Sequence, residues 1–362
     1  MAAHNIAFSA ATTSIDPISF PAFKAKPYLN SGHIMTTLMP LRRPKLEVPR
    51  TETKLIAVSQ DSRIKIRYSW QPAGDKDTPT LLLVHGLGGS AQAGYIRSLA
   101  GKAYALGYHV VRYNMRNCDG TEHLSPTMFH SGLTEDIDVV VNNLIKEEKL
   151  SRIFLAGFSL GGNLVAKLAG EWSSNAPKAV RGLGLVSPAL NLKASQVAMD
   201  ERISLRGYRY YYMRSLRALI HYKKRIFPDA YDVRGLDDVH SFLEFDNRYI
   251  APPFGFDDAN DYYDRASAKN VVADIRLPTL LIHAKDEEDA MRIANDSRYG
   301  LGGGILCKDT ERAIELASKH FDTGMVFINT FGVADPSMPF GGVKNSGIGR
   351  FNGEWAIDAS ET

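Results

Sequence analysis

The sequence predicts a doubly wound α/β fold, in which helices cover both faces of a mostly parallel β-sheet. Short continuous apolar runs, such as TLLLV at 80–84, are typical of strands that a parallel sheet buries on both faces. Segments with helical periodicity alternate with these runs, and this alternation favours a doubly wound sheet. The chain has 362 residues, enough for one such domain with an appendage, or for two domains.

The strands of this fold can be placed along the chain in order. Residues 54–60 and 63–70 alternate apolar and polar side chains with a period of two, as half-buried strands do. The runs that fit fully buried strands are 80–86, 108–114, 152–158, 182–188 and 279–284. Among the helices expected between them, residues 134–147 give the clearest signal, because they form one apolar stripe and carry acids in the first turn.

The alternation of strands and helices stops between residues 191 and 270. This stretch contains an aromatic-rich, basic segment, RISLRGYRYYYMRSLRALIHYKKRIF, followed by irregular sequence with Pro and Asp. A long insertion between two sheet strands predicts a helical cap over an active site. We interpret its Arg and Lys side chains as solvated helix faces, with a phospholipid or anionic-substrate role as the alternative.

Composition and charge exclude several classes of protein. A net charge of +3 is too small to indicate a nucleic-acid partner. Cys118 and Cys307 form neither a disulfide framework nor a metal-ligand spacing, which favours a reducing, cytoplasmic location and no bound metal. No stretch approaches the roughly eighteen consecutive apolar residues of a membrane span, so we expect no transmembrane segment. Residues 1–22 are expected to be extended or disordered.

The run Gly157-Phe158-Ser159-Leu160-Gly161 predicts a nucleophile elbow. It lies where the expected strand 152–158 ends and an amphipathic helix, LGGNLVAKLAGEW, begins. In an elbow, a strained strand-to-helix turn lifts the serine hydroxyl above the sheet, and only small residues two before and two after leave room for it. An ordinary glycine-rich turn is the alternative.

A nucleophilic serine also needs two N–H donors aimed at the developing oxyanion. The loop His85-Gly86-Leu87-Gly88-Gly89 follows the third expected strand, where it can supply one donor, which we assign to Leu87. Leu160, directly after the serine, would supply the other. A simple turn is the alternative for this loop, but its pairing with the elbow favours the oxyanion role.

The third expected element is an acid that follows a later strand and orients a histidine base. Asp286, in HAKDE, follows the expected strand 279–284. No acid follows the strand at 182–188, so no rival occupies the other usual position. Asp286 is therefore the candidate acid.

Residues 23–286 resemble the YheT-like branch of the α/β-hydrolases, a group of predicted carboxylic-ester hydrolases. The matching segments are HGLGGS, MRNCDGTEH with FHSGLTEDI, GFSLGGN, LEFDNRYIAPPFGFDDANDYYDRASA and LPTLLIHAKD. The resemblance implies a cofactor-free serine hydrolase that acts on small ester or lipid-like acyl substrates. It further implies that Ser159 is the nucleophile and Asp286 the acid.

Residues 287–362 resemble instead the C-terminal segment of the aldehyde dehydrogenase family. The matching runs are ANDSRYGL and the more specific PFGGVKNSGIGR. This segment includes neither the dinucleotide-binding domain nor the catalytic cysteine and glutamate of that family. Cys307 lies in GGILCKD, whose family counterpart is a structural strand and turn. No Rossmann G-x-G-x-x-G follows a strand, so we expect no nicotinamide site.

This second segment does not supply the histidine that the hydrolase family places after the acid. Periodicity predicts a helix at 287–296, a strand GGILC, a helix at 309–320 and a strand MVFIN, which could in principle extend the parallel sheet. No histidine follows the first of these strands, and recruitment of His320, at a helix end, is the alternative. Losing one member of a triad costs on the order of 10⁴ to 10⁶ in turnover.

The leading hypothesis is an esterase-like hydrolase with a truncated triad and little or no activity. A non-catalytic fusion product or pseudoenzyme that at most binds acyl ligands is the second, and an aldehyde dehydrogenase relative is a remote third. The join is expected to uncover an apolar sheet edge and to favour aggregation. The sequence leaves the acyl length and the oligomeric state open.

Overall fold

The computed structural model describes residues 50–283, together with residues 299–300, 303–305, 310–322, 326–328 and 343–344. The chain divides into two compact units, Met1–Leu281 and Ile282–Thr362, and each is described by itself. The predictions for residues 1–22, for the helix at 287–296 and for Asp286 lie outside the described residues. The domain boundary placed after residue 286 stays a prediction.

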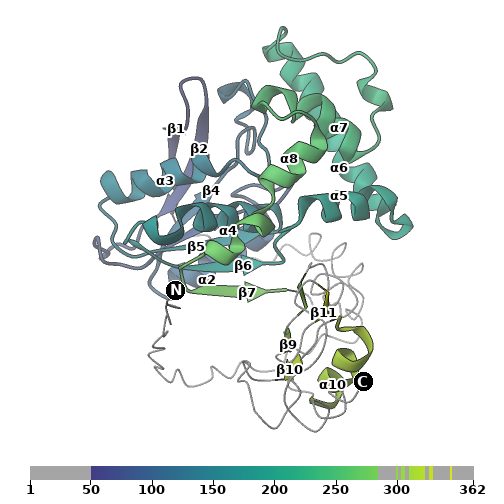
Figure 1. Cartoon of the computed structure of the whole chain (residues 1–362). Helices are drawn as coiled ribbons and strands as arrows, with labels where there is room; N and C mark the ends of the chain where they lie inside the picture. Colours follow the sequence, from purple (N-terminus) through teal and green to yellow (C-terminus); the bar gives the residue numbers. More distant parts are fainter. Residues whose placement is uncertain are drawn as a thin grey trace, which may run out of the picture. The chain divides into compact units, whose positions relative to one another are not determined.

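A seven-stranded sheet forms the centre of the first unit (Figure 1). Its strands are β1 (Glu52–Ala57), β2 (Arg63–Ser69), β3 (Thr80–Val84), β4 (His109–Tyr113), β5 (Ile153–Phe158), β6 (Val180–Val186) and β7 (Thr279–Ile282). Their order across the sheet is β1-β2-β4-β3-β5-β6-β7. The pairs β1/β2 and β2/β4 are antiparallel, whereas β3/β4, β3/β5 and β5/β6 are parallel. The mostly parallel sheet that the sequence predicts is therefore confirmed.

Helices cover both faces of this sheet. Successive residues of a strand point to opposite faces, so neighbouring residues pack against different helices. The helices are α2 (Gly94–Ala105), α3 (Thr134–Lys146) and α4 (Leu160–Trp172). Leu83 packs in one buried cluster with Ile96 of α2. Its neighbour Leu82 belongs to a second, larger cluster with Val140 of α3 and Leu164 of α4. This arrangement is the predicted doubly wound fold.

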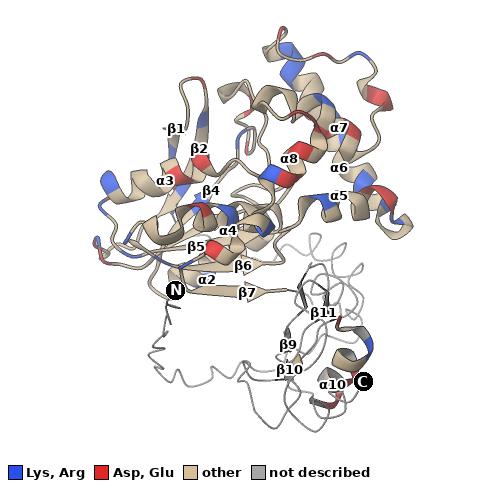
Figure 2. Ribbon diagram, viewed as in Figure 1, with Lys and Arg blue, Asp and Glu red and all other residues tan. Residues whose placement is uncertain are grey.

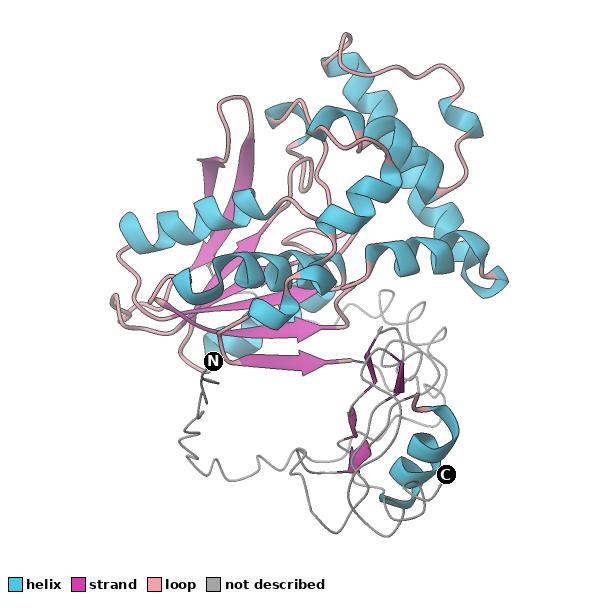
Figure 3. Cartoon of the chain, in the orientation of Figure 1, coloured by secondary structure: helices cyan, strands magenta, loops and turns pink. Residues whose placement is uncertain are grey.

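Residues 191–270 form a helical cap, as the sequence predicts (Figure 3). Its elements are α5 (Leu192–Glu201), η4 (Ile203–Leu205), α6 (Arg206–Ile226), η5 (Leu236–Asp238), α7 (Phe242–Tyr249), η6 (Pro252–Phe254), α8 (Ala259–Ala266) and η7 (Ala268–Asn270). The cap has a buried cluster of its own, which includes Met213, Ile220 and Phe245. Burial of this apolar surface stabilises the cap.

One buried lysine connects the cap to the loop that follows β4. The Nζ of Lys223, on α6, donates hydrogen bonds to the backbone carbonyls of Glu122 and Ser125, in and after η2 (Glu122–Leu124). It also lies 4.4 Å from the ring centroid of Phe227. Burial lowers the pKa of Lys223 to about 8. A buried ammonium is costly unless it is hydrogen-bonded, so these contacts fix α6 against the loop that follows β4.

The strand β7 exposes apolar side chains. Leu280, Leu281 and Ile282 expose 51%, 54% and 50% of their surfaces, whereas every residue of β4 is buried. Figure 2 shows β7 without a charged residue. Exposed apolar strands at a sheet edge favour pairing with other chains. Among the described strands of this sheet, β7 is at the edge, so within residues 50–283 an apolar edge lies where the sequence leads us to expect one.

The described part of the second unit contains short strands and one helix. They are β8 (Tyr299–Gly300), β9 (Gly303–Ile305), α10 (Thr310–His320), β10 (Val326–Ile328) and β11 (Val343–Lys344). The pair β9/β10 is parallel and β8/β11 is antiparallel. A strand, a helix and a parallel strand in succession form a local β-α-β unit. These strands pair with one another in two two-stranded sheets, β9/β10 and β8/β11.

Candidate active site

Ser159 lies between β5 and α4 in a strained backbone conformation. Its φ of 52° and ψ of −116° lie in a region that non-glycine residues occupy at a cost of about 1–3 kcal/mol. Its N–H donates to the Val186 carbonyl at 3.0 Å, and its carbonyl accepts from the N–H groups of Asn163 at 3.1 Å and Ala189 at 3.2 Å. The residue is exposed, so the turn presents the hydroxyl outward.

Close backbone packing leaves no room for side chains at the two glycines of the elbow. A Cβ at Gly157 would lie 2.3 Å from the carbonyl oxygen of Gly161. A Cβ at Gly161 would lie 2.3 Å from the carbonyl oxygen of His85. Both obstacles are backbone atoms, which cannot move aside cheaply. The elbow and the loop after β3 are therefore packed directly against each other.

His85 fixes the loop that passes beside the serine. Its ring is buried, and Nε2 accepts the Met115 N–H at 3.2 Å. Nδ1 therefore carries the proton and donates to the Gly86 carbonyl, 2.8 Å away. Burial lowers the pKa of His85 to about 4, so the ring is neutral at pH 7. A Cβ at Gly86 would lie 3.2 Å from the Cβ of Ser159, so this loop contacts the serine.

Two backbone N–H groups near the serine have no hydrogen-bond acceptor within residues 50–283. They belong to Leu87 and Leu160. Leu160 is the first residue of α4, and the first N–H groups of a helix have no intrahelical acceptor. The N–H of Gly86, by contrast, donates to Tyr95 Oη at 2.9 Å. The two free donors are the ones that the sequence assigns to the oxyanion.

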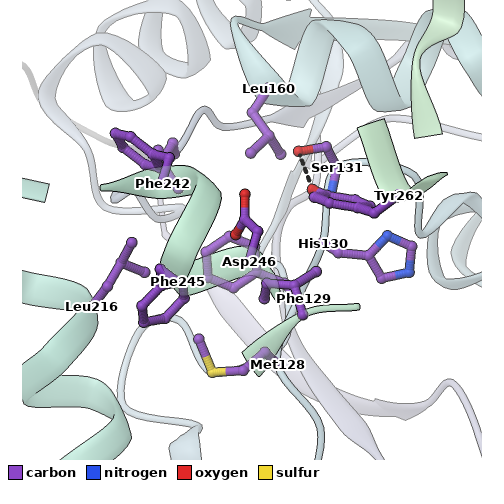
Figure 4. A pocket seen from close by; sticks show the side chains of 12 residues that line it. Met128, Phe129, His130, Ser131, Leu160, Leu216, Phe242, Phe245, Asp246 and Tyr262 are labelled. Atoms are coloured by element: carbon purple, nitrogen blue, oxygen red, sulfur yellow. Dashed lines mark hydrogen bonds between the residues drawn. The ribbon is translucent and has the colours of Figure 1, made fainter. Parts of the chain in front are cut away.

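Leu87 and Leu160 both line a cavity of about 70 Å³ between the sheet and the cap (Figure 4). The other apolar walls are Met128, Phe129, Leu216, Phe242, Phe245 and Ile250. Tyr262 Oη donates to Ser131 Oγ at 2.9 Å across one side of the cavity. Mostly apolar walls with a few polar groups are typical of small-molecule sites.

The structure does not describe the predicted acid, nor a base for the serine. Asp286 and the side chain of His320 lie outside the described residues. His130 lines the cavity, but its Nδ1 accepts the Gly132 N–H at 3.1 Å. Burial, with contributions from Arg116 and Lys167, lowers the pKa of His130 to about 3. An imidazole of such low pKa is a weak general base, as is His85.

Sequence reasoning missed a carboxyl group in this cavity. Asp246, on α7, lines the cavity and accepts a hydrogen bond from Tyr263 Oη at 2.6 Å. Asp246 and Tyr263 both lie in LEFDNRYIAPPFGFDDANDYYDRASA, a segment that carries part of the family resemblance. A family-specific segment with acids and tyrosines inside the cap was the signal that could have found them.

A buried ion pair holds the segment that carries the cavity residues Met128 to Ser131. The Arg116 guanidinium donates to both Asp136 oxygens, at 2.6 and 2.7 Å, and to Thr127 Oγ1 at 2.8 Å. The two charged side chains expose only 8% and 1% of their surfaces. Asp136 lies in the first turn of α3, so the pair connects this helix to the loop after β4. A bidentate pair of this kind is geometrically specific.

The described residues contain no group of three or more His, Cys, Asp or Glu side chains able to hold a metal ion. Among the described helices, none combines the length and the apolar character that crossing a membrane requires.

Comparisons with known proteins find two families. A family described as alpha/beta hydrolase fold matches residues 79–289, and the aldehyde dehydrogenase family matches residues 278–361. The putative esterase YheT of Escherichia coli (strain K12) is 32% identical over 226 residues, which cover 62% of this chain and 66% of that protein. Phospholipase ABHD3 of Mus musculus is 27% identical over 209 residues, covering 58% of this chain and 50% of that protein.

Among solved structures, the esterase Pf2001 of Pyrococcus furiosus is similar over 78% of this chain and 83% of its own. Its sequence identity is 14% and the TM-score is 0.40. The chain spans between 50% and 66% of the length of the two curated relatives named above.

Proposed function

Since the chain belongs to the α/β-hydrolase fold family, we propose that it cleaves carboxylic esters with Ser159 as the nucleophile. It is a chimera, because residues 278–361 match the aldehyde dehydrogenase family. The observation that carries the proposal is the left-handed backbone of Ser159, at φ 52°, beside two N–H groups without acceptors. A strained residue held by its surroundings is typical of an active site.

In this proposal the Ser159 Oγ attacks the ester carbonyl carbon, and the carbonyl oxygen becomes an oxyanion. The N–H groups of Leu87 and Leu160 donate to that oxygen, and one such donor is worth about 10² to 10³ in turnover. Loss of the alcohol leaves an acyl group on Ser159, which water then removes. The cavity that both leucines line takes the part of the substrate next to the reacting carbon.

We assign the acid role to Asp286, and we propose that turnover is low. The sequence after Asp286 offers no histidine where the family places its base, and the two buried histidines near the serine, His85 and His130, are held neutral by depressed pKa values. A serine hydroxyl without a base attacks slowly at neutral pH. We assign no nicotinamide chemistry to the C-terminal segment.

The test of the nucleophile is labelling with a fluorophosphonate probe followed by peptide mapping. We expect slow labelling of the wild-type chain at Ser159 and none in Ser159→Ala. Ser173→Ala is a matched control, because Ser173 has a similar backbone, at φ 47° and ψ −121°, but lies at the end of α4. Labelling that persists in Ser159→Ala, or that is lost in Ser173→Ala, contradicts the assignment.

Hydrolysis of p-nitrophenyl butyrate tests the low turnover. We expect the wild-type rate to exceed that of Ser159→Ala by less than about 10³, well below the roughly 10⁶ of an intact triad, because a serine without a base adds little and the oxyanion donors and binding act in both chains. A larger ratio means that a base has been recruited. Loss of that ratio in His320→Ala would identify the base.

A further inference from the structure

Asp246 is a half-buried carboxyl group without a cationic partner among the described residues. Tyr263 Oη donates to its Oδ2 at 2.6 Å. Within residues 50–283 no Lys or Arg forms an ion pair with it, and the charged group that acts on it is Asp200, which has the same sign. Burial first, and then Asp200, raise the pKa of Asp246 to about 7. A carboxylate held largely away from water is usually paired with a cation, and this half-buried one has no such partner within residues 50–283.

The cavity offers room for that partner. Asp246 lines it, and Figure 4 shows the carboxyl group in the middle of the lining side chains. Tyr263 engages only Oδ2, which leaves Oδ1 for a ligand. The rings of Phe129, Phe242 and Phe245 line the same cavity. Aromatic faces attract cations, and a charge-assisted hydrogen bond to a carboxylate is among the stronger polar contacts.

We propose that the cavity binds a protonated amine of the substrate and that Asp246 selects it. This inference rests on the proposed function, because it names the esters that Ser159 would take. Leu87 and Leu160 line the same cavity, so the ammonium group belongs to the part of the ester next to the scissile carbonyl. A ligand hydroxyl would bind the acid and the carboxylate alike, and would give no preference for charge.

No Lys or Arg is among the described residues that line the cavity. The two cations that act on His130, Arg116 and Lys167, are paired with Asp136 and Glu171. His130 lines the cavity, but burial keeps its pKa near 3 and the ring neutral at pH 7. Tyr263 is hydrogen-bonded to Asp246 itself. The Asp200 carboxylate is negative and accepts the N–H groups of Phe242 at 2.9 Å and Leu243 at 3.1 Å, so it stays at the start of α7.

The experiment compares 4-amino-1-butanol with 1-pentanol, a pair in which an ammonium group replaces a methyl group. Binding to the full chain is measured at about pH 8 by ligand-observed NMR titration, which needs no turnover. We expect the amine to bind the wild-type chain about tenfold or more tightly. Asp246→Asn should lose this preference and keep its affinity for 1-pentanol. Amine binding should also weaken as the pH falls through about 7, the pKa of Asp246.

Asp257→Asn is the matched control, because it removes one exposed cap carboxylate and changes the net charge equally. Tyr263→Phe is a second test that keeps the carboxylate, and it should keep the preference for the amine. Equal binding of the two alcohols by the wild-type chain, no binding of either, or an equal loss in Asp257→Asn overturns the proposal. Labelling of Ser159 is measured separately, so failure here and failure of the proposed function are distinguishable.

Discussion

The elbow region and the strand β7, which belong to one sheet, differ in how fully they are partnered. The backbone of Ser159 is held by hydrogen bonds with three residues, and Gly157 and Gly161 have no room for a Cβ. In β7, Leu280 and Leu281 expose about half of their surfaces, 51% and 54%. β7 lies where the two family matches overlap, at residues 278–289. The comparison teaches that the tightly packed turn at Ser159 lies within the hydrolase match alone, whereas the exposed apolar strand lies where the two matches overlap.

The largest effect on stability is expected at the buried ion pair of Arg116 and Asp136, which holds the segment that carries several cavity residues. Arg116→Leu leaves the Asp136 carboxylate buried and unpaired, which should lower the free energy of unfolding by about 3–5 kcal/mol. Urea denaturation measures this change. Arg265→Leu is the control, because Arg265 pairs with Asp261 at 3.0 Å but is 55% exposed, and should cost less than about 1 kcal/mol. Similar losses of unfolding free energy in the two variants would contradict the expectation that the buried pair stabilises the fold more than the exposed one.

The next largest effect should come from Gly161→Ala. The new Cβ would lie 2.3 Å from the His85 carbonyl oxygen, which should cost about 3 kcal/mol of unfolding free energy and abolish labelling of Ser159. Gly184→Ala is the control, because the nearest atom to its Cβ is a side-chain atom at 3.6 Å. A Gly161→Ala variant as stable as Gly184→Ala would show that the elbow has more room than its packing indicates.

Within the cap, the dependence of folding stability on pH tests whether the Asp246 carboxylate lies in an unfavourable environment. Asp246 has a folded-state pKa of about 7, above the value of about 3.9 expected when unfolded. Between these values the folded chain binds more protons, so this group lowers stability as the pH rises. Asp246→Asn removes that loss and should be more stable than the wild type by about 1–3 kcal/mol at pH 8, but not at pH 4. Thermal unfolding at both pH values measures the difference, and a variant less stable at pH 8 would contradict it.

The smallest effect on the free energy of unfolding should come from a substitution in β7. Leu281→Lys should change the free energy of unfolding by less than about 0.5 kcal/mol, because the side chain is already half exposed. It should reduce aggregation, because a charge on an apolar edge strand opposes pairing between chains. Light scattering during concentration measures this. Leu106→Lys is the control, because Leu106 is 77% exposed but follows α2 rather than lying in a strand. An equal reduction of aggregation in both variants would mean that the added charge, rather than its position on an edge strand, is the cause.

The regular elements could be predicted from the sequence because their signals are local. The helix after the serine begins at Leu160 and ends at Trp172, the bounds of the run LGGNLVAKLAGEW. The walls of the cavity could not be predicted, because they come from segments as far apart as Leu87 and Phe242. The contact between Asp246 and Tyr263 depends likewise on how α7 and α8 pack. The roles of Ser159 and Asp286 stay predictions.

Because of the left-handed backbone at position 159, the residue that folding favours there differs from the residue that our proposed mechanism requires. Glycine adopts a φ of 52° without a steric penalty, so folding alone favours glycine at this position. Ser159→Gly should raise the free energy of unfolding by about 1 kcal/mol, even after the greater freedom of the unfolded chain is counted. Drift without selection would therefore tend to replace this serine. A serine at this position therefore lowers folding stability, which is the trade-off expected if Ser159 is the nucleophile that we propose.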